Sequence, residues 1–180
     1  ERVLLSDEVL KLLHQSVEGE LAQVLVFVPT IFLAERVASF LKREFELPPF
    51  NNFDGSWVNY THSHDSQRDK KRDDFLRGDF PVLVSTSLLE RGINIPKVNV
   101  LVLFAQNHYI YDTRTLVQMA GRAGRTTEYP DGRVWFIGSR ITPAMREAVK
   151  WINKMNKEAA EQGYLKRLPM LQLSRLKRVR

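Results

Sequence analysis

The most informative stretch of this sequence spans residues 118 to 125 and reads Gln118-Met119-Ala120-Gly121-Arg122-Ala123-Gly124-Arg125. If the run from Thr113 onward is helical, with 3.6 residues per turn, then Gln118, Arg122 and Arg125 share one sector of the helix. The opposite, apolar side then carries Leu116, Ala120 and Ala123. The pattern therefore predicts a helix with an apolar face toward a core and a second face bearing two guanidinium groups.

Two glycines interrupt this predicted helix, and each costs roughly 1 kcal/mol of helix stability relative to alanine. Gly121 and Gly124 therefore indicate that another backbone or a ligand comes close. Two guanidiniums about one turn apart can hold phosphoryl oxygens and stabilise charge during phosphoryl transfer, as an arginine finger does. The alternative is a solvated face whose arginines pair with acids. The complete pattern Gln-x-x-Gly-Arg-x-Gly-Arg favours the phosphate role.

Composition sets broad limits on the fold and on the ligands. The 180 residues fit one α/β domain with terminal additions, and 43% of them are hydrophobic and 27% charged. The net charge of +6 and the pI near 9.7 favour a polyanionic partner. Cysteine is absent and the four histidines have no ligand-like spacing, so no metal site is expected. Neither a membrane-spanning run nor a signal-peptide layout is seen, which predicts a cytoplasmic protein.

Strands and helices are predicted to alternate along the chain. Nearly continuous apolar runs are typical of parallel strands covered on both faces. Strands are expected over residues 21–28, 57–61, 80–85, 98–104 and 133–137. Helices are expected after the cap at Ser6, over 31–45, over 66–77, and from Pro143 to Gly163. In the helix over 31–45 the residues expected to be buried are Ile31, Ala34, Ala38, Leu41 and Phe45. The last helix is expected to keep on one side Met145, Ala148, Ile152, Met155 and Ala159. The prediction is an α/β sandwich of three layers with a mostly parallel sheet of at least five strands.

Several polar or aromatic residues follow the predicted strands. Thr30 can receive a backbone phosphate beside a helix N-terminus, or it is simply the N-cap of that helix. His62 follows the strand over 57–61 and is a candidate contact with nucleic acid. The loop over 105–112 carries His108, Tyr109 and Tyr111, which either stack on bases or pack locally. All candidate site segments are expected at the carboxyl ends of strands or at helix starts.

The octet at 118–125 resembles the sixth motif of superfamily 2 helicases and translocases, in the second of their two RecA-like lobes. The stretch over 24–30 resembles the fourth motif, and the stretch over 85–96 resembles the fifth. The three motifs occur in the family's order, and the resemblance covers about residues 21 to 140. It implies a RecA-like, P-loop NTPase-type fold and the C-terminal lobe of a helicase.

The same resemblance implies roles for individual residues. Arg125, the preferred finger, and Arg122 are the implied catalytic arginines. The residues implied to bind nucleotide are Gln118, Gly92 and Asn94, and many relatives carry aspartate at the last of these. The residues implied to contact nucleic acid are Thr30, His62, Thr86, Glu90 and Arg91.

Finer detail resembles the competence translocase family ComFA, with the primosomal helicase PriA as the next resemblance. The residues that carry it lie at 60–63, 89–92 and 117–130. The resemblance implies a cytoplasmic ATPase that draws single-stranded DNA inward during transformation. It also implies other competence proteins as partners, which would hold the protein at the inner face of the membrane.

No Gly-x-x-x-x-Gly-Lys-Ser/Thr loop and no apolar strand ending in an Asp-Glu box is found. ATP and Mg²⁺ are therefore expected to bind mainly to an N-terminal RecA-like lobe outside these residues, and this chain alone is expected to be inactive. Two alternatives stay open, a non-catalytic module that binds nucleic acid or docks a partner, and the lobe of an RNA helicase. The expected organisation is a connecting helix over 1–20, the lobe over 21–165 and a basic tail over 166–180.

Overall fold

A five-stranded parallel sheet forms the centre of the protein in a computed structural model, which describes residues 5–44, 57–86, 95–124, 126 and 129–164. The strands are β1 (Gln23–Phe27), β2 (Val58–Thr61), β3 (Val82–Ser85), β4 (Val98–Val102) and β5 (Val134–Phe136). Their order across the sheet is β2-β3-β1-β4-β5, and each neighbouring pair is parallel. The predicted parallel sheet of at least five strands is confirmed.

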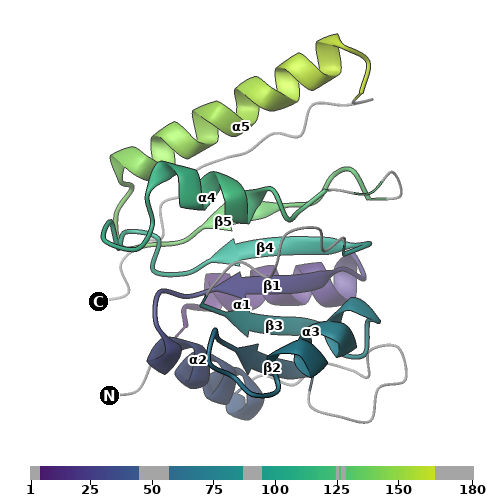
Figure 1. Ribbon diagram of the computed structural model, residues 1–180, viewed down its shortest axis with the longest axis vertical. Helices are drawn as coiled ribbons and strands as arrows, with labels where there is room; N and C mark the ends of the chain where they lie inside the picture. Colours follow the sequence, from purple (N-terminus) through teal and green to yellow (C-terminus); the bar gives the residue numbers. More distant parts are fainter. Residues whose placement is uncertain (1–4, 45–56, 87–94, 125, 127–128, 165–180) are drawn as a thin grey trace.

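Helices cover both faces of this sheet (Figure 1). They are α1 (Asp7–His14), its π-helical continuation η1 (Gln15–Gly19), α2 (Ile31–Glu44), α3 (Arg68–Leu76), α4 (Thr113–Ala120) and α5 (Pro143–Glu161). In Figure 1, α1 and α2 lie behind the strands and α3 and α4 in front, while α5 packs on α4. The predicted three layers are therefore present.

The apolar core is divided between the two faces because side chains alternate along each strand. Val24 and Val26 of β1 pack with the residues of α1 and α2, including Leu13. Leu25 and Phe27 point to the other face and pack with residues of α3, α4 and α5. A strand buried on both sides explains the unbroken apolar run that the sequence shows there.

The predicted cap at Ser6 is confirmed, and so is the helix that begins at Pro143. The Ser6 hydroxyl accepts the backbone N–H of Val9, and the Thr142 hydroxyl accepts that of Met145. Gly78 and Gly163 follow α3 and α5 with φ angles of 79° and 78°, which favour glycine.

The predicted burial of Ile31 is wrong, since this first residue of α2 is 43% exposed. Met155, predicted to share one side of α5 with Met145, is also exposed. Helix α5 extends past α4 (Figure 1). The buried face of α2 instead adds Val37 and Phe40. Phe45 lies outside the described residues.

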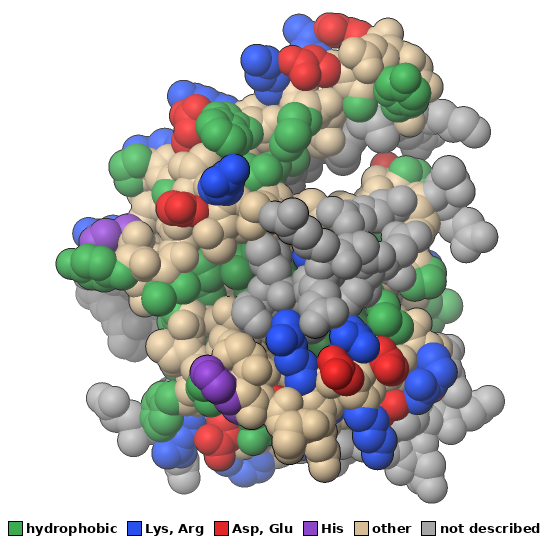
Figure 2. All heavy atoms as spheres, in the orientation of Figure 1, with side chains coloured by type: hydrophobic (Ala, Val, Ile, Leu, Met, Phe, Trp, Pro, Cys, Tyr) green, Lys and Arg blue, Asp and Glu red, His purple; other side chains and the backbone are tan. Residues whose placement is uncertain are grey.

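The outer face of α3 is solvated, as its interleaved charges predict. Arg72 pairs with Asp69 and Asp73, and Arg77 pairs with Asp74. Figure 2 shows blue and red side chains mixed over this part of the surface. Exposed pairs of this kind contribute little stability, so α3 is held mainly by its buried Phe75.

Candidate functional site

At the carboxyl edge of the sheet, three of the predicted site residues lie just beyond the ends of neighbouring strands. Phe27, Ser85 and Thr61 are aligned in the ladder of β1, β3 and β2. Thr30, Thr86 and His62 come shortly after these three residues. Segments that follow parallel strands meet at the same edge, which is where open α/β sheets bind their ligands.

Thr30 is the cap of α2. Its hydroxyl oxygen accepts the backbone N–H of Leu33 at 3.2 Å, and its carbonyl accepts that of Ala34. The hydroxyl proton is not used in these bonds, and the side chain is exposed. Capping and donation to a phosphate oxygen are therefore compatible at this residue.

The loop after β2 is held by several contacts around His62. The His62 ring stacks on Tyr60 with 6.5 Å between centroids, and its Nδ1 accepts the His64 backbone N–H. Lys71 donates to the Tyr60 carbonyl at 3.0 Å and to Asp65 at 2.7 Å. Burial raises the pKa of Asp65, but the bond and charge of Lys71, together with bonds from the Gln67 backbone and Thr61, outweigh it, so the pKa of this carboxyl is lowered. The half-buried His62 is thus fixed in position by its surroundings.

The aromatic residues in the loop after β4 were predicted either to stack on bases or to pack locally, and they differ in burial. Tyr111 is fully buried and packs in the core, and burial raises its pKa. Tyr109 is 87% exposed, and the centroid of its ring lies 4.1 Å from that of the neighbouring His108 ring. Packing is therefore the role of Tyr111, whereas His108 and Tyr109 are free to meet a ligand.

The arginine segment differs from the predicted long helix. Helix α4 starts at the Asp112 cap, whose carboxylate accepts the Thr115 N–H at 2.7 Å, and ends at Ala120. The chain then turns, with the Arg122 N–H donating to the Met119 carbonyl. Arg122 is only 7% exposed, whereas Gln118 is exposed. The predicted shared face of Gln118 and Arg122 is wrong, because the helix stops before Arg122 and the turn carries this side chain inward.

The expectation of a close backbone at Gly124 is confirmed. Its φ is +65°, and a Cβ there would lie 2.8 Å from the Pro130 carbonyl oxygen. A Cβ on Gly132 would in turn lie 2.8 Å from the Gly124 Cα. We call residues 121–126, as far as they are described, the arginine turn; its neighbour is the chain that returns to β5. Arg125 lies outside the described residues.

The arginine turn lies at the amino edge of the sheet, opposite Thr30, His62 and Thr86. Helix α4 leaves the carboxyl edge and runs back, and at its far end Thr126 donates to the Pro96 carbonyl at 2.5 Å, just before β4. The prediction that all site segments lie at carboxyl ends or helix starts is therefore wrong for Gln118 and Arg122. Glu90, Arg91, Gly92 and Asn94 lie outside the described residues.

A polar network beside the arginine turn was missed by sequence reasoning. The Tyr129 hydroxyl donates to Glu20 at 2.7 Å and lies 3.1 Å from Asn99 Oδ1. Asn99, fully buried in β4, donates to Ser16 and Glu20 and accepts the Arg133 N–H at 2.8 Å. The Arg133 guanidinium pairs with Glu20 at 3.1 Å. The signal in the sequence is an asparagine inside an apolar strand, since a buried amide needs partners.

This network also changes the acidity of the Tyr129 hydroxyl. Burial, followed by the bond to Glu20, raises the pKa of Tyr129 to about 12. Lys97 lies over the Tyr129 ring at 5.1 Å. The network joins η1, β4 and the segment after the arginine turn, so it fixes that turn against the amino edge.

Among the described residues, no group of three or more His, Cys, Asp or Glu side chains is placed so that it could hold a metal ion. In the same residues, no helix has the length and apolar character that crossing a membrane requires.

The parallel sheet, its two covered faces and the arginine turn define a RecA-like helicase lobe of the C-terminal type. The chain belongs to the helicase conserved C-terminal domain family, whose sequence model matches residues 6–127. A solved structure of the Mycobacterium smegmatis helicase Lhr, bound to ssDNA and AMP-PNP, has the same fold, with a TM-score of 0.58 at 23% identity over 84% of this chain and 18% of that one.

Within this family, the chain is similar to competence protein ComFA. It is 35% identical to ComFA of Bacillus subtilis over 138 residues, which are 77% of this chain and 27% of that protein. It is 31% identical to ComFA of Streptococcus pneumoniae over 136 residues, 76% of this chain and 29% of the relative. The resemblance read from the motifs is confirmed, and the chain spans less than a third of the length of these relatives.

Proposed function

We propose that this chain is the second motor lobe of an ATP-dependent translocase that moves single-stranded DNA, and that the motor serves DNA uptake in competence. The observation that carries the proposal is the separation of two edges. Hydroxyl and imidazole groups line the carboxyl edge, and the arginine turn lies at the amino edge. Similarity to ComFA supports the biological role.

On this proposal, the amino edge completes a nucleotide site. ATP and Mg²⁺ would be held mainly by an N-terminal RecA-like lobe of the same polypeptide, and hydrolysis of ATP supplies the energy for movement. Arg125 is the proposed finger that stabilises charge on the transferred phosphoryl group. Gln118 is exposed in the last turn of α4 and is proposed to contact nucleotide. Gly92 and Asn94 are proposed nucleotide contacts from the family resemblance alone. The burial of Arg122 suits a group that supports the turn and reaches nucleotide only when the lobes close.

The carboxyl edge would grip the strand. Thr30, Thr86 and His62 are proposed to contact the sugar-phosphate backbone, as are Glu90 and Arg91. Contacts of this kind position a strand without reading its sequence, as a motor that passes any DNA requires. Opening and closing of two lobes would move the grip along the strand. The proposed place of action is the cytoplasm, at the inner membrane face through other competence proteins.

The test uses the longer protein that contains this lobe, and measures phosphate release with single-stranded DNA, duplex DNA, RNA or no nucleic acid. We expect stimulation by single-stranded DNA, and a fall of about 10³-fold in Arg125→Ala with strand binding retained. Arg146→Ala, an exposed arginine on α5, is the matched control and should keep wild-type turnover.

Other outcomes separate the alternatives. Stimulation by RNA alone would identify an RNA helicase lobe. Tight, salt-dependent binding with no stimulated hydrolysis would identify a non-catalytic binding module instead. Equal loss of turnover and strand binding in Arg125→Ala would contradict the finger role.

A further inference from the structure

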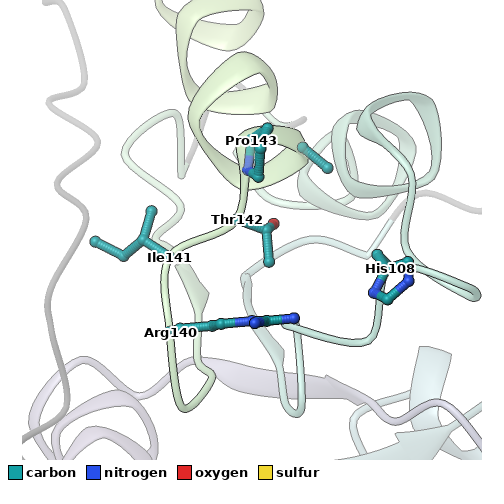
Figure 3. Close-up of a pocket in the computed structure, with 6 residues that line it drawn as sticks. His108, Arg140, Ile141, Thr142 and Pro143 are labelled. Carbon is teal, nitrogen blue, oxygen red and sulfur yellow. The ribbon is translucent and has the colours of Figure 1, made fainter.

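A surface pocket of about 570 Å³ lies between the loop after β4 and the start of α5 (Figure 3). It is lined by His108, Arg140, Ile141, Thr142, Pro143 and Ala144. Ile141, Pro143 and Ala144 give it apolar walls. The Arg140 side chain extends across the pocket toward His108, which comes from the other element. The pocket thus combines apolar surface with a cation and an imidazole.

Within the part of the chain that the structure describes, the guanidinium of this pocket is available to a ligand. Arg140 is exposed, and no hydrogen bond or ion pair of its guanidinium occurs within the described part of the chain. The one carboxylate of the neighbouring loop, Asp112, is engaged in capping α4. Beside the pocket, Tyr109 is 87% exposed, and its ring lies next to the His108 ring. An exposed aromatic pair next to an available guanidinium is suited to a ligand with both flat rings and negative charge.

The pocket continues the carboxyl edge described above. Arg140 follows β5 and His108 follows β4, just as Thr30 follows β1 and Thr86 follows β3. In the spatial order of the strands, the edge therefore presents His62, Thr86, Thr30, His108 and Arg140 in sequence. Five strands spaced by about 4.8 Å extend over roughly 19 Å. The proposed contacts with nucleic acid lie at the ends of three of the five β-strands, and the pocket lies at the ends of the other two.

We propose that this pocket is an additional subsite for single-stranded nucleic acid, in which Arg140 pairs with a backbone phosphate and His108 and Tyr109 stack on a base. The inference rests on the proposed function, because the strand must already lie along the carboxyl edge to enter the pocket. The planar guanidinium matches phosphate oxygens, and stacking on aromatic rings accepts any base. The subsite would lengthen the strand path beyond β1 without adding sequence preference.

The experiment measures binding of fluorescent oligothymidylates of increasing length to the longer protein, in wild type, Arg140→Ala, Arg140→Lys and Tyr109→Ala. Arg140→Ala should lower the affinity for long strands several-fold and reduce the log–log salt slope by about 0.7, the value for one phosphate contact. Arg140→Lys should keep most of the affinity and the slope, because the charge remains. Tyr109→Ala should lower the affinity on the order of tenfold.

Arg77→Ala is the matched control, because it removes an exposed arginine at the opposite edge. Wild-type affinity and slope in both Arg140→Ala and Tyr109→Ala, as in Arg77→Ala, would overturn the subsite. Thr30→Asp tests the proposed grip separately, since it should weaken strands of every length. If Thr30→Asp lowers the affinity but the pocket variants do not, the subsite alone is overturned. If only the pocket variants lower the affinity, the subsite is supported and the role of Thr30 in binding is contradicted. Thermal unfolding of each variant verifies that it is folded.

Discussion

The two edges of the sheet are built from different chemistry. The carboxyl edge presents exposed groups in the segments that follow the strands, such as Thr30 and Tyr109, and their side chains have few partners among the described residues. The amino edge buries Asn99 and joins it to Glu20 and Tyr129 in a connected network. An exposed edge meets a ligand with little reorganisation, whereas a connected edge holds a neighbouring segment in one geometry. The difference indicates one edge for contact and one for positioning.

The largest expected effect comes from Gly132→Ala. The new Cβ would lie against the backbone of Gly124 at distances that folded proteins do not tolerate, so the arginine turn must move. We expect a loss of about 3 kcal/mol in the free energy of unfolding, measured by urea denaturation. In the longer protein, ATP turnover should fall while strand affinity is largely kept.

Gly19→Ala is the control for this change. Its Cβ would meet only the Gln15 side chain at 3.9 Å, an ordinary contact, so the free energy of unfolding should change by less than about 1 kcal/mol. If Gly132→Ala lowered the affinity for single-stranded DNA as much as the ATP turnover, the two edges would not act separately.

Tyr129→Phe removes one bond of the amino-edge network, and we expect it to cost about 1.5 kcal/mol near neutral pH. The pKa of Tyr129 is raised by folding from about 10 to about 12, so its contribution is complete below pH 10 and is lost as the pH rises toward 12. The difference in unfolding free energy between wild type and Tyr129→Phe should therefore shrink over that range.

Tyr164→Phe serves as the control for alkaline effects, because Tyr164 is 78% exposed. A difference between wild type and Tyr129→Phe that stays constant from pH 9 to pH 12 would contradict the hydrogen bond to Glu20 as its source.

Thr30 gives the smallest effect on stability and separates its two roles. Thr30→Ala should lose about 1 kcal/mol through the missing cap. Thr30→Asp keeps a capping oxygen, so unfolding should be nearly unchanged, while the added negative charge should weaken strand binding several-fold. Unchanged strand binding in Thr30→Asp, measured by fluorescence anisotropy, would leave only the capping role.

The sequence predicts the sheet well because its strands are buried on both faces and are read directly as apolar runs. It fails at α4 because the helical projection assumes that the helix continues through Gly121. In the structure this glycine ends the helix, and its N–H donates to the Val117 carbonyl. Arg122 then leaves the face shared with Gln118. Four residues after the exposed Gln118, the Arg122 side chain is therefore buried.

The network at the amino edge could not be predicted for a different reason. Asn99 bonds to Ser16 across 83 residues, and Tyr129 bonds to Glu20 across 109. Local periodicity carries no information about such pairs. Only the fold brings them together, because β4 lies beside β1, and the chain enters β1 through η1 and Glu20. Thr30, His62 and Thr86 could be proposed from the sequence because each comes within three residues of the end of a recognisable strand.

The long separations around Asn99 also have a consequence for the order in which the molecule folds. Synthesis makes α1 and η1 before β4, yet Glu20 obtains its bond from Tyr129 only after the arginine turn has been made. Contacts between distant segments are slow to form because the intervening chain must first be ordered. We therefore expect this closure late in folding, so that weakening it accelerates unfolding more than it slows folding. The arginine turn would then reach its final place only when the lobe is otherwise complete.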